Sequence, residues 1–234
     1  METNFECKPI QHYECLEWCK YKHYAHRIPP ISFAFGLYEN NVLVGICTYG
    51  KPIAFSLIQN VLKGQYQDII YELNRLCVNE GLPKNTLSWF VSQTLHLLPK
   101  PMCIVSYADS SQGHHGYIYQ ATNWIYTGLS IPFKDIMVKG YEGKHSASIN
   151  DLVGRSDKNG GHMQKKKLLI EKFGEENVYT VERARKHRYF MFIGNKTQIK
   201  KMKSLFNYDI LPYPKGDNKR YDATYNTHPQ LKLF

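Results

Sequence analysis

The fold class is decided by residues 69–109, which read IIYELNRLCVNEGLPKNTLSWFVSQTLHLLPKPMCIVSYAD. The stretch begins with an apolar run that is typical of a strand, and Gly81 and Pro83 then impose a loop. Apolar side chains next recur at helical spacing, and a second apolar run ends at Asp109. Strand, loop, helix and strand in this order predict an α/β (α+β) protein, with a mixed central sheet flanked by helices.

The helix in this stretch has both boundaries marked. Asn85 or Thr86 is expected to cap its first turn, and Pro99 follows its end. Free N–H groups at such a helix N-terminus bind anions, and Lys84 adds positive charge. Arg75 lies inside the preceding strand, where a guanidinium needs a carboxylate or phosphate partner, and Glu72 is one option for that partner. The apolar face expected on the helix is Leu87, Phe90, Val91, Thr94, Leu95 and Leu98.

The rest of the chain shows a change in texture near residue 140. Before it, residues 31–50 predict a β-hairpin that turns at Asn40-Asn41, and GHHGYIYQATN at 113–123 predicts a short helix. After it, we expect a loop, a basic helix in GHMQKKKLLIEKFG, a strand in HRYFMFIG, a basic helix in NKTQIKKMKSLF and an irregular tail. Residues 1–140 are therefore the expected catalytic core, and residues 141–234 a basic DNA-binding lobe packed on it.

Nearly all of the positive charge lies in the C-terminal part. Residues 1–140 hold 11 Lys/Arg and 10 Asp/Glu, whereas residues 141–234 hold 19 and 10. Such a region is typical of proteins that neutralise DNA phosphates, although a merely solvated surface has the same composition. Two segments alternate cations with rings, which can stack on bases. The candidate DNA-binding residues in them are Lys186, Arg188, Lys215, Lys219 and Arg220.

Composition excludes a membrane-spanning protein. No run approaches the roughly 18–20 continuous apolar residues that a span requires, and METNFECKPI lacks the pattern of a signal peptide, so we expect a folded cytoplasmic protein. Six cysteines without paired spacing favour buried thiols over disulfides. Cys15 and Cys19 with His12 and His23 imitate a zinc site, but their spacing matches no familiar closed site.

Polar side chains follow the strand that ends at Asp109. A carboxylate at this end of a strand lies at the sheet edge where α/β proteins bind ligands, so Asp109 is the first candidate to accept a proton or bind a metal. His114 and His115 are candidates for proton transfer or phosphate contact, with a bland loop role as the alternative. The aromatic side chains behind them are expected to stack on a base drawn out of its helix.

Six motifs carry a resemblance to a known family: ELNRLCV, PKN, IVSYAD, GHHGYIYQATNWIYTG, YPKGDNKRYD and the early HYAHRIP. From about residue 18 onward, the chain resembles the Mom family of bacteriophage DNA-modification proteins. These proteins are regarded as distant relatives of the GNAT-type N-acetyltransferase fold, whose acyl-CoA segment the strand, loop and helix at ELNRLCVNEGLPKNTLSWF also resemble. The glycine-rich loop of that fold is absent, because GLPKNT has a single glycine.

The resemblance implies a transferase of the infected bacterial cell. Such an enzyme adds a carbamoylmethyl (acetamido) group to the exocyclic amino group of adenine in double-stranded DNA, which protects the DNA from host restriction. The resemblance implies iron as a candidate cofactor with Tyr24, His23 and Asp109 as ligands, and phenolate, imidazole and carboxylate groups suit iron. The donor is open: acetyl-CoA or another activated compound, although an acetyl thioester lacks the amide nitrogen of the product.

The resemblance also assigns roles to residues of the core. Tyr119 matches a family tyrosine and is a candidate acid or base-stacking ring, with helix packing as the alternative. Ser88 matches a family serine and is a candidate catalytic and cofactor-binding residue, together with Arg75, Lys84 and Asn85 on the cofactor side.

Two other functions compete with this one. An ordinary acetyl-CoA-dependent N-acyltransferase that acts on a small amine or a protein is the first, and a non-catalytic DNA-binding protein is the second. The oligomeric state is open, with a homodimer as one option.

Overall fold

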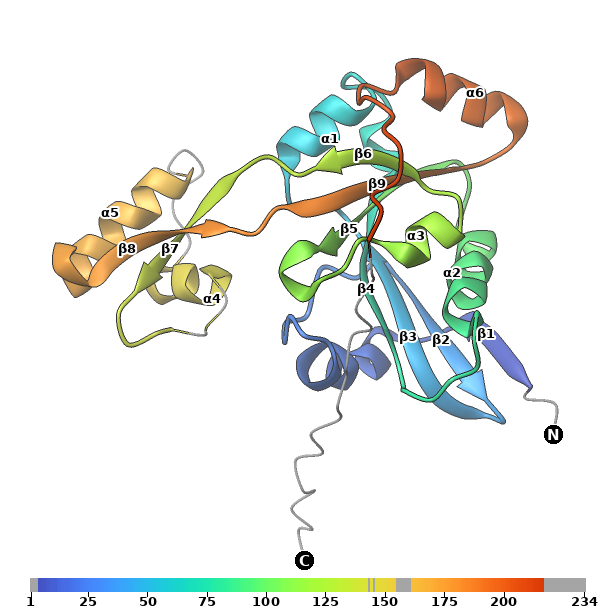
Figure 1. Ribbon diagram of the computed structural model, residues 1–234, viewed down its shortest axis with the longest axis horizontal. Coiled ribbons are helices and arrows are strands. Elements are labelled where there is room, and N and C mark those ends of the chain that lie inside the picture. Colours follow the sequence, from blue (N-terminus) through green and yellow to red (C-terminus); the bar gives the residue numbers. More distant parts are fainter. Residues whose placement is uncertain (1–3, 143, 145, 155–160, 217–234) are drawn as a thin grey trace, which may run out of the picture. The chain divides into compact units, whose positions relative to one another are not determined.

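The computed structural model describes residues 4–142, 144, 146–154 and 161–216 (Figure 1). The chain divides into two compact units, Met1–Leu129 with Lys186–Phe234, and Ser130–Arg185. These bounds differ from the expected division at residue 140, because the strand that begins at Lys186 pairs inside the main sheet. The catalytic and DNA-binding roles assigned to residues 1–140 and 141–234 stay predictions.

The first unit is built on a seven-stranded mixed sheet in the order β1-β2-β3-β4-β5-β9-β6 (Figure 1). Strands β4 and β5 pair in parallel, and every other neighbouring pair in this sheet is antiparallel. The predicted mixed central sheet is therefore confirmed. The strands are β1 (Phe5–Pro9), β2 (Phe33–Glu39), β3 (Val42–Gly50), β4 (Ile70–Val78), β5 (Met102–Asp109), β6 (Ile125–Leu129) and β9 (Lys186–Ile193).

Helices cover both faces of this sheet. Ile104 of β5 joins the core under α2 (Thr86–Leu97) and α3 (Tyr117–Ala121). Its neighbours Cys103 and Val105 join the core under α1 (Phe55–Val61) and α6 (Lys196–Leu205). Successive side chains of a strand point to opposite faces, so we call these the α2/α3 face and the α1/α6 face.

The expected hairpin and helix are confirmed. Strands β2 and β3 turn at Asn40 and Asn41, whose φ angles of 49° and 67° lie in the left-handed region that asparagine tolerates. Helix α2 buries Phe90, Val91, Thr94 and Leu95, and Leu98 beyond it, on the predicted apolar face. The expected capping hydrogen bond is wrong: Asn85 precedes the helix with a φ of 71°, and its side chain makes no such bond.

Two local predictions need correction. Helix α3 begins at Tyr117, later than expected, because Gly116 has a φ of 79° that no helix allows. The loop expected after residue 140 contains α4 (Ser146–Asn150), which forms because Ile149 is buried in a core of its own unit. Short 3₁₀ or π segments are η1 (His12–Cys15), η2 (Trp18–Lys22), η3 (Gln67–Ile69), η4 (Ser110–Gln112), η5 (Asp151–Val153) and η6 (Glu175–Asn177).

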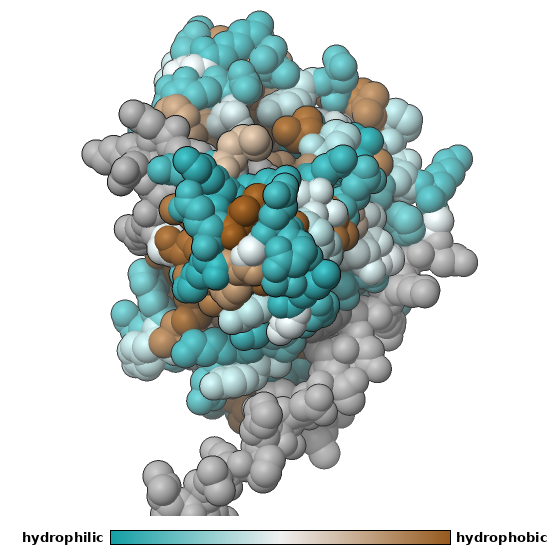
Figure 2. All heavy atoms as spheres, turned by 90° about the vertical axis from the view of Figure 1, so that its left-hand side faces the viewer, coloured by the Kyte–Doolittle hydropathy of each residue, from teal (hydrophilic) through white to brown (hydrophobic). Residues whose placement is uncertain are grey.

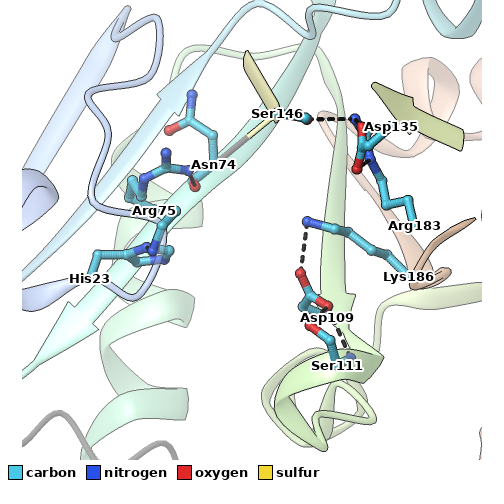
Figure 3. Close-up of polar contacts among 10 residues, drawn as sticks. His23, Asn74, Arg75, Asp109, Ser111, Asp135, Ser146, Arg183 and Lys186 are labelled. Carbon is cyan, nitrogen blue, oxygen red and sulfur yellow. Dashed lines mark hydrogen bonds and ion pairs between the residues drawn. The ribbon is translucent and has the colours of Figure 1, made fainter. Parts of the chain in front are cut away.

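The second unit has its own small core. Strands β7 (Phe133–Val138) and β8 (Val178–Arg183) form a two-stranded antiparallel sheet, and α4 and α5 (Gly161–Phe173), which lie between them in the chain, complete the unit. Its core consists of Ile136, Val138, Ile149, Leu169 and Val178. The guanidinium of Arg183 pairs with the carboxylate of Asp135, and its Nη2 lies 3.3 Å from the Ser146 hydroxyl (Figure 3).

The hydrophilic surface and the free cysteines are what the composition predicts. The face drawn in Figure 2 is largely hydrophilic, with smaller hydrophobic areas. Within the described ranges, no helix has both the length and the apolar character needed to cross a membrane. All six cysteines are free, and five of them are buried, as the prediction of buried thiols requires.

Candidate active site

Asp109 lies at the C-terminal end of β5, where its carboxylate has three polar contacts. Its Oδ1 accepts hydrogen bonds from the backbone N–H and the hydroxyl of Ser111, at 3.0 and 2.6 Å. Its Oδ2 lies 2.9 Å from the ammonium of Lys186, which is the residue opposite Asp109 in the pairing of β5 with β9 (Figure 3). A buried carboxylate is thus held in one orientation by two neighbours.

These contacts decide the charge of Asp109. Burial alone would raise the pKa of this carboxyl, because water no longer solvates its charge. The hydrogen bonds from Ser111 and the ion pair with Lys186 outweigh burial, so the pKa of Asp109 lies below its ordinary value. The carboxylate is ionised at neutral pH and can accept a proton.

The early His23-Tyr24 pair follows a π-helical segment, η2. A π-helix is rare and often occurs at functional sites, and here the N–H of His23 closes it by donating to the carbonyl of Trp18 at 2.9 Å. The ring of Tyr24 lies edge-on to that of His114, with 6.3 Å between centroids. The backbone N–H of His114 donates to the carbonyl of Asp109 at 3.3 Å. His114 thus contacts both residues, Tyr24 through its ring and Asp109 through its backbone.

Histidines in this cluster are kept neutral. Burial lowers the pKa of His23 to about 3, and the nearby charges of Arg75 and Lys186 add to this effect. Its Nδ1 accepts a hydrogen bond from the N–H of Ala25 at 3.1 Å, which fixes the ring. Burial also lowers the pKa of His114, although the charge of Asp109 acts in the opposite direction.

Arg75 and Glu72 complete the charged cluster on β4. The Nε and Nη2 of Arg75 donate to the carbonyl of Arg27, at 3.3 and 2.9 Å, and Nη1 donates to the carbonyl of Asn74 at 2.6 Å. The guanidinium therefore has carbonyl partners. Among the described residues it forms no ion pair with Glu72, whose charge acts on it only at longer range. Burial raises the pKa of Glu72 to about 7, and the charges of Arg75 and Lys186 only partly offset this. Glu72 is consequently a group that can give or take a proton near neutral pH.

Tyr119 lies in the core of the α2/α3 face. Its hydroxyl is 2.7 Å from the hydroxyl of Ser106, and its ring centroid is 5.1 Å from that of Trp124. Burial raises the pKa of Tyr119, so it stays a neutral phenol. Trp124 and Tyr126 are buried with it, whereas Tyr117 is 56% exposed. Trp124 and Tyr126, two of the aromatic residues expected to stack on a base, are therefore core residues.

The candidate cofactor residues lie around the N-terminus of α2. Lys84 and Asn85 are exposed, and Ser88 is partly buried. The hydroxyl of Ser88 donates to the carbonyl of Asn85 at 3.0 Å, and it does not accept from the free N–H groups of the first turn. The roles predicted for these three residues and for Arg75 stay predictions.

The candidate DNA-binding residues fall into two groups. Lys186 pairs with Asp109, and Arg188 donates to the Thr127 hydroxyl at 2.9 Å while its guanidinium lies 3.9 Å from the centroid of the Tyr208 ring. Both cations thus have partners within the first unit. Lys215 is exposed. Lys219 and Arg220 lie outside the described residues.

The implied iron ligands Tyr24, His23 and Asp109 do not form a preassembled metal site in this structure. In the part of the chain that the structure describes, no three or more His, Cys, Asp or Glu side chains form a group that could hold a metal. Both oxygens of Asp109 already have protein partners, and an ammonium occupies the position that a cation would take beside Oδ2. The residues as placed do not fit iron, and we derive no step through it.

Sequence reasoning missed Lys186 as the partner of Asp109, and Ser111 beside it. The pairing of β5 with β9 joins positions 77 residues apart (109 and 186), and no local pattern reveals such a contact. Glu72 was considered only as a partner for Arg75. Its place in an otherwise apolar strand was the available signal, because a buried carboxyl has a raised pKa.

Known proteins resemble this chain in sequence and in structure. A family model described as the Mom protein family matches residues 4–215. The methylcarbamoylase Mom of Escherichia phage Mu is 24% identical over 202 residues, which cover 83% of this chain and 77% of that protein. A solved N-acetyltransferase from Staphylococcus aureus Mu50 gives a TM-score of 0.42 at 10% identity, over 81% of this chain and 98% of that one.

A second solved structure is a putative acetyltransferase from Acinetobacter baylyi ADP1. It gives a TM-score of 0.45 at 10% identity, over 82% of this chain and 93% of that one. The sequence match carries the assignment. The family model matches residues 4–215, which are most of the chain and include the cluster around Asp109. This chain belongs to the Mom protein family.

Proposed function

We propose that this chain is a DNA-modification enzyme of a bacteriophage. It adds a carbamoylmethyl group to the exocyclic amino group of adenine in double-stranded DNA, which then resists host restriction enzymes. Membership of the Mom family and the similarity to a methylcarbamoylase support the reaction class. The observation that carries the proposal is the ionised carboxylate of Asp109, held by Lys186 and Ser111 at the end of β5.

Asp109 is the proton acceptor in this proposal. When the adenine nitrogen forms a bond to the carbon of the incoming group, the bond between that carbon and the leaving group of the activated donor breaks, and the leaving group departs with the electron pair of that bond. The nitrogen must then lose one of its two protons. A carboxylate within hydrogen-bonding reach accepts that proton as the bond forms, and general base catalysis of this kind contributes about 10²–10⁴ in rate. The adenine has to leave the base stack first, because its amino group is paired while it remains inside the duplex.

The neighbours of Asp109 hold this geometry. Lys186 keeps the carboxylate ionised, and Tyr24 and His114 lie beside it as a polar wall for the extruded base. Glu72 is a second acid or base near the same charges, with a pKa of about 7. This pairing resembles the general pattern in which two carboxyl groups with separated pKa values divide the acid and base roles.

The donor binds, in this proposal, at the N-terminus of α2. Free N–H groups there favour an anion such as a phosphate of an activated donor, and Lys84 adds a positive charge. Asn85 and Ser88 lie at the same turn. Arg75 supports the segment that carries His23 and Tyr24, through its bonds to the carbonyl of Arg27.

Nucleoside analysis tests this function. The protein is produced in a bacterium, plasmid DNA is digested to nucleosides, and the adenine fraction is measured by mass spectrometry. The proposal predicts a deoxyadenosine heavier by one acetamido substituent, and unmodified deoxyadenosine in an active preparation would contradict it. Acylation of a small amine or a protein, with unmodified DNA, would indicate an ordinary acyltransferase.

Fragmentation identifies the group itself. A carbamoylmethyl and a methylcarbamoyl group have the same elemental composition, so the total mass does not separate them. A methylcarbamoyl group joined to nitrogen as a urea releases methyl isocyanate on fragmentation, whereas a carbamoylmethyl group loses ammonia. The proposal predicts the second pattern.

A further inference from the structure

Helix α6 has one apolar side and one cationic side. Met202 is buried in the core of the α1/α6 face, and Ile199 and Leu205 pack against the same core. The other side of the helix carries four exposed lysines and no acidic residue. These lysines are Lys196, Lys200, Lys201 and Lys203.

The four ammonium groups have no partner within the described ranges. None of them has an ion-pair or hydrogen-bond partner among the residues that the structure describes, and no Asp or Glu occurs between Lys186 and Asp209. The contrast with α5 is direct, since Lys167 there lies 3.9 Å from Glu171 one turn later. Like charges one turn apart, such as Lys196 and Lys200, destabilise a helix by about 0.2–0.5 kcal/mol per pair.

Helix α6, whose lysine side is exposed, packs on the face of the sheet to which Asp109 points. Along β5, the side chains of Cys103 and Val105 point to the α1/α6 face, and the alternation of a strand places Asp109 on that face as well. Along β9, Phe190 and Phe192 point to the same face, and alternation places Lys186 there. The ion pair of Lys186 with Asp109 agrees with this placement.

The helix also runs back toward the catalytic end of β9. Strand β9 starts at Lys186 and ends at Ile193, and α6 follows that end (Figure 1). After the helix, Phe206 contacts the ring of Phe190 at 5.1 Å, and Tyr208 contacts Arg188 at 3.9 Å. The chain thus returns to Arg188, two residues from Lys186, only after the helix has ended. The lysines lie on the segment between the Ile193 end of β9 and this return. The whole strand spans only about 25 Å, or roughly seven base pairs of duplex.

We propose that the four lysines of α6 bind the phosphate backbone of duplex DNA and hold the duplex over the Asp109 site. This inference rests on the proposed function for its partner. It replaces Lys186 and Arg188, whose cations have partners inside the protein, as the main backbone contacts. Lysine ammonium groups at the backbone contribute affinity without sequence preference, because each one that meets a phosphate releases a condensed counterion.

The test compares two variants of the full chain with equal net charge. The first is K196Q/K200Q/K201Q/K203Q on α6. The matched control removes four exposed lysines from other elements and is K20Q/K63Q/K100Q/K139Q. Binding of a fluorescein-labelled duplex of about two helical turns is followed by anisotropy at several salt concentrations, with circular dichroism to verify folding.

The expected result is a loss confined to the α6 variant. Its affinity should fall more than about tenfold, and the slope of log affinity against log salt should drop by about 0.9 for each lysine that meets a phosphate. The control should stay within about twofold of the original protein. A third variant with arginine at the four positions should keep the slope, which covers the case in which the glutamine variant does not fold.

Equal losses in the α6 variant and in its control would overturn the inference, because they would reflect net charge alone. A loss of binding to single-stranded DNA with unchanged duplex binding would overturn it too. Nucleoside analysis separates this inference from the proposed function. Modified adenine with equal losses in both variants defeats only the inference, whereas unmodified adenine with a loss confined to α6 defeats only the function.

Discussion

Strand β9 and helix α6 follow one another in the chain, and both are basic, but they use their cations differently. The ammonium of Lys186 pairs with Asp109, and the guanidinium of Arg188 bonds to Thr127 and lies over the ring of Tyr208. The lysines of α6 have no such partners in the described chain. The difference teaches that a count of basic residues locates a charged region but does not say which charges are available to a ligand.

The Lys186 end of β9 gives the largest expected effect. Lys186→Gln removes the positive charge beside Asp109, so the pKa of Asp109 should rise. Carboxyl-carbon NMR titration of the labelled protein measures this pKa. The modified fraction of plasmid adenine should also fall, because the variant loses the ion pair that orients the carboxylate. Lys186→Arg should keep both values near those of the original protein. An unchanged Asp109 pKa in Lys186→Gln would show that the ion pair does not control the carboxylate.

Arg188 tests the comparison through the free energy of unfolding. Arg188→Gln loses the stacking on Tyr208 and the bonds to Thr127, and we expect a loss of about 1–3 kcal/mol in the free energy of unfolding. The salt slope of DNA binding should not change. The glutamine variant of α6 should show the reverse, with unchanged unfolding and a smaller slope. Denaturant unfolding and anisotropy on the same samples give both quantities, and a changed slope in Arg188→Gln would break the distinction.

A substitution at Gly116 tests the close packing of the loop after Asp109 against Tyr189 of β9. A Cβ at this position would lie 2.4 Å from a ring carbon of Tyr189, and the residue has a φ of 79°. Gly116→Ala should therefore lower the free energy of unfolding by about 2–4 kcal/mol. Gly81→Ala is the control, because Gly81 has a φ of 77° with nothing within 4 Å. Equal losses in the two variants would mean that backbone strain alone is measured.

His23 gives an effect of another kind, a dependence of stability on pH. Its pKa in the folded protein is about 3, below the ordinary 6.5, so its contribution to stability is present above pH 6.5 and falls as the pH drops toward 3. The slope is at most about 1.4 kcal/mol per pH unit. His23→Asn keeps an acceptor for the N–H of Ala25 and removes the titration. Denaturant unfolding between these pH values should show a shallower slope in the variant, and an identical slope would contradict the buried neutral histidine.

Glu72 changes the stability with pH in the opposite direction, so its contribution has to be measured separately from that of His23. Its pKa in the folded protein is about 7, above the ordinary 4.5, so its contribution is present below pH 4.5 and is lost as the pH rises toward 7. Glu72→Gln removes this term. The double variant with His23→Asn then shows whether the two dependences add.

Local patterns were sufficient for most elements of the fold. The helical spacing of Phe90, Val91 and Leu95, and the two asparagines of the hairpin turn, each predict an element that the structure contains. No such sequence pattern marks strand β1 or the antiparallel pair of β7 and β8. Strand β8 is mostly exposed, and its partner lies 40 or more residues away. The place of β9 between β5 and β6 is a long-range pairing, so the boundary at residue 140 could not be corrected from composition.

The site was predictable where chemistry is tied to the end of an element. Asp109 closes an apolar strand, which is why its position at the sheet edge followed from the sequence. Its approach to Tyr24 depends on the fold of residues 18–24 and on the loop that carries His114, and only the family resemblance anticipated it. The partner Lys186 was expected on the DNA, because a cation on an amphipathic strand gives no sign of which carboxylate it will meet.

The central claim is that the carboxylate of Asp109 takes the proton from adenine. Nucleoside mass spectrometry of plasmid DNA from cells that make Asp109→Asn tests it most directly, since asparagine keeps the size and the oxygen that accepts from Ser111 but has no charge. Asp209→Asn, at an exposed carboxylate outside the site, is the matched control. The account predicts modified adenine at the original level with the control and a loss of at least about 100-fold with Asp109→Asn. Undiminished modification by a folded Asp109→Asn protein would contradict it.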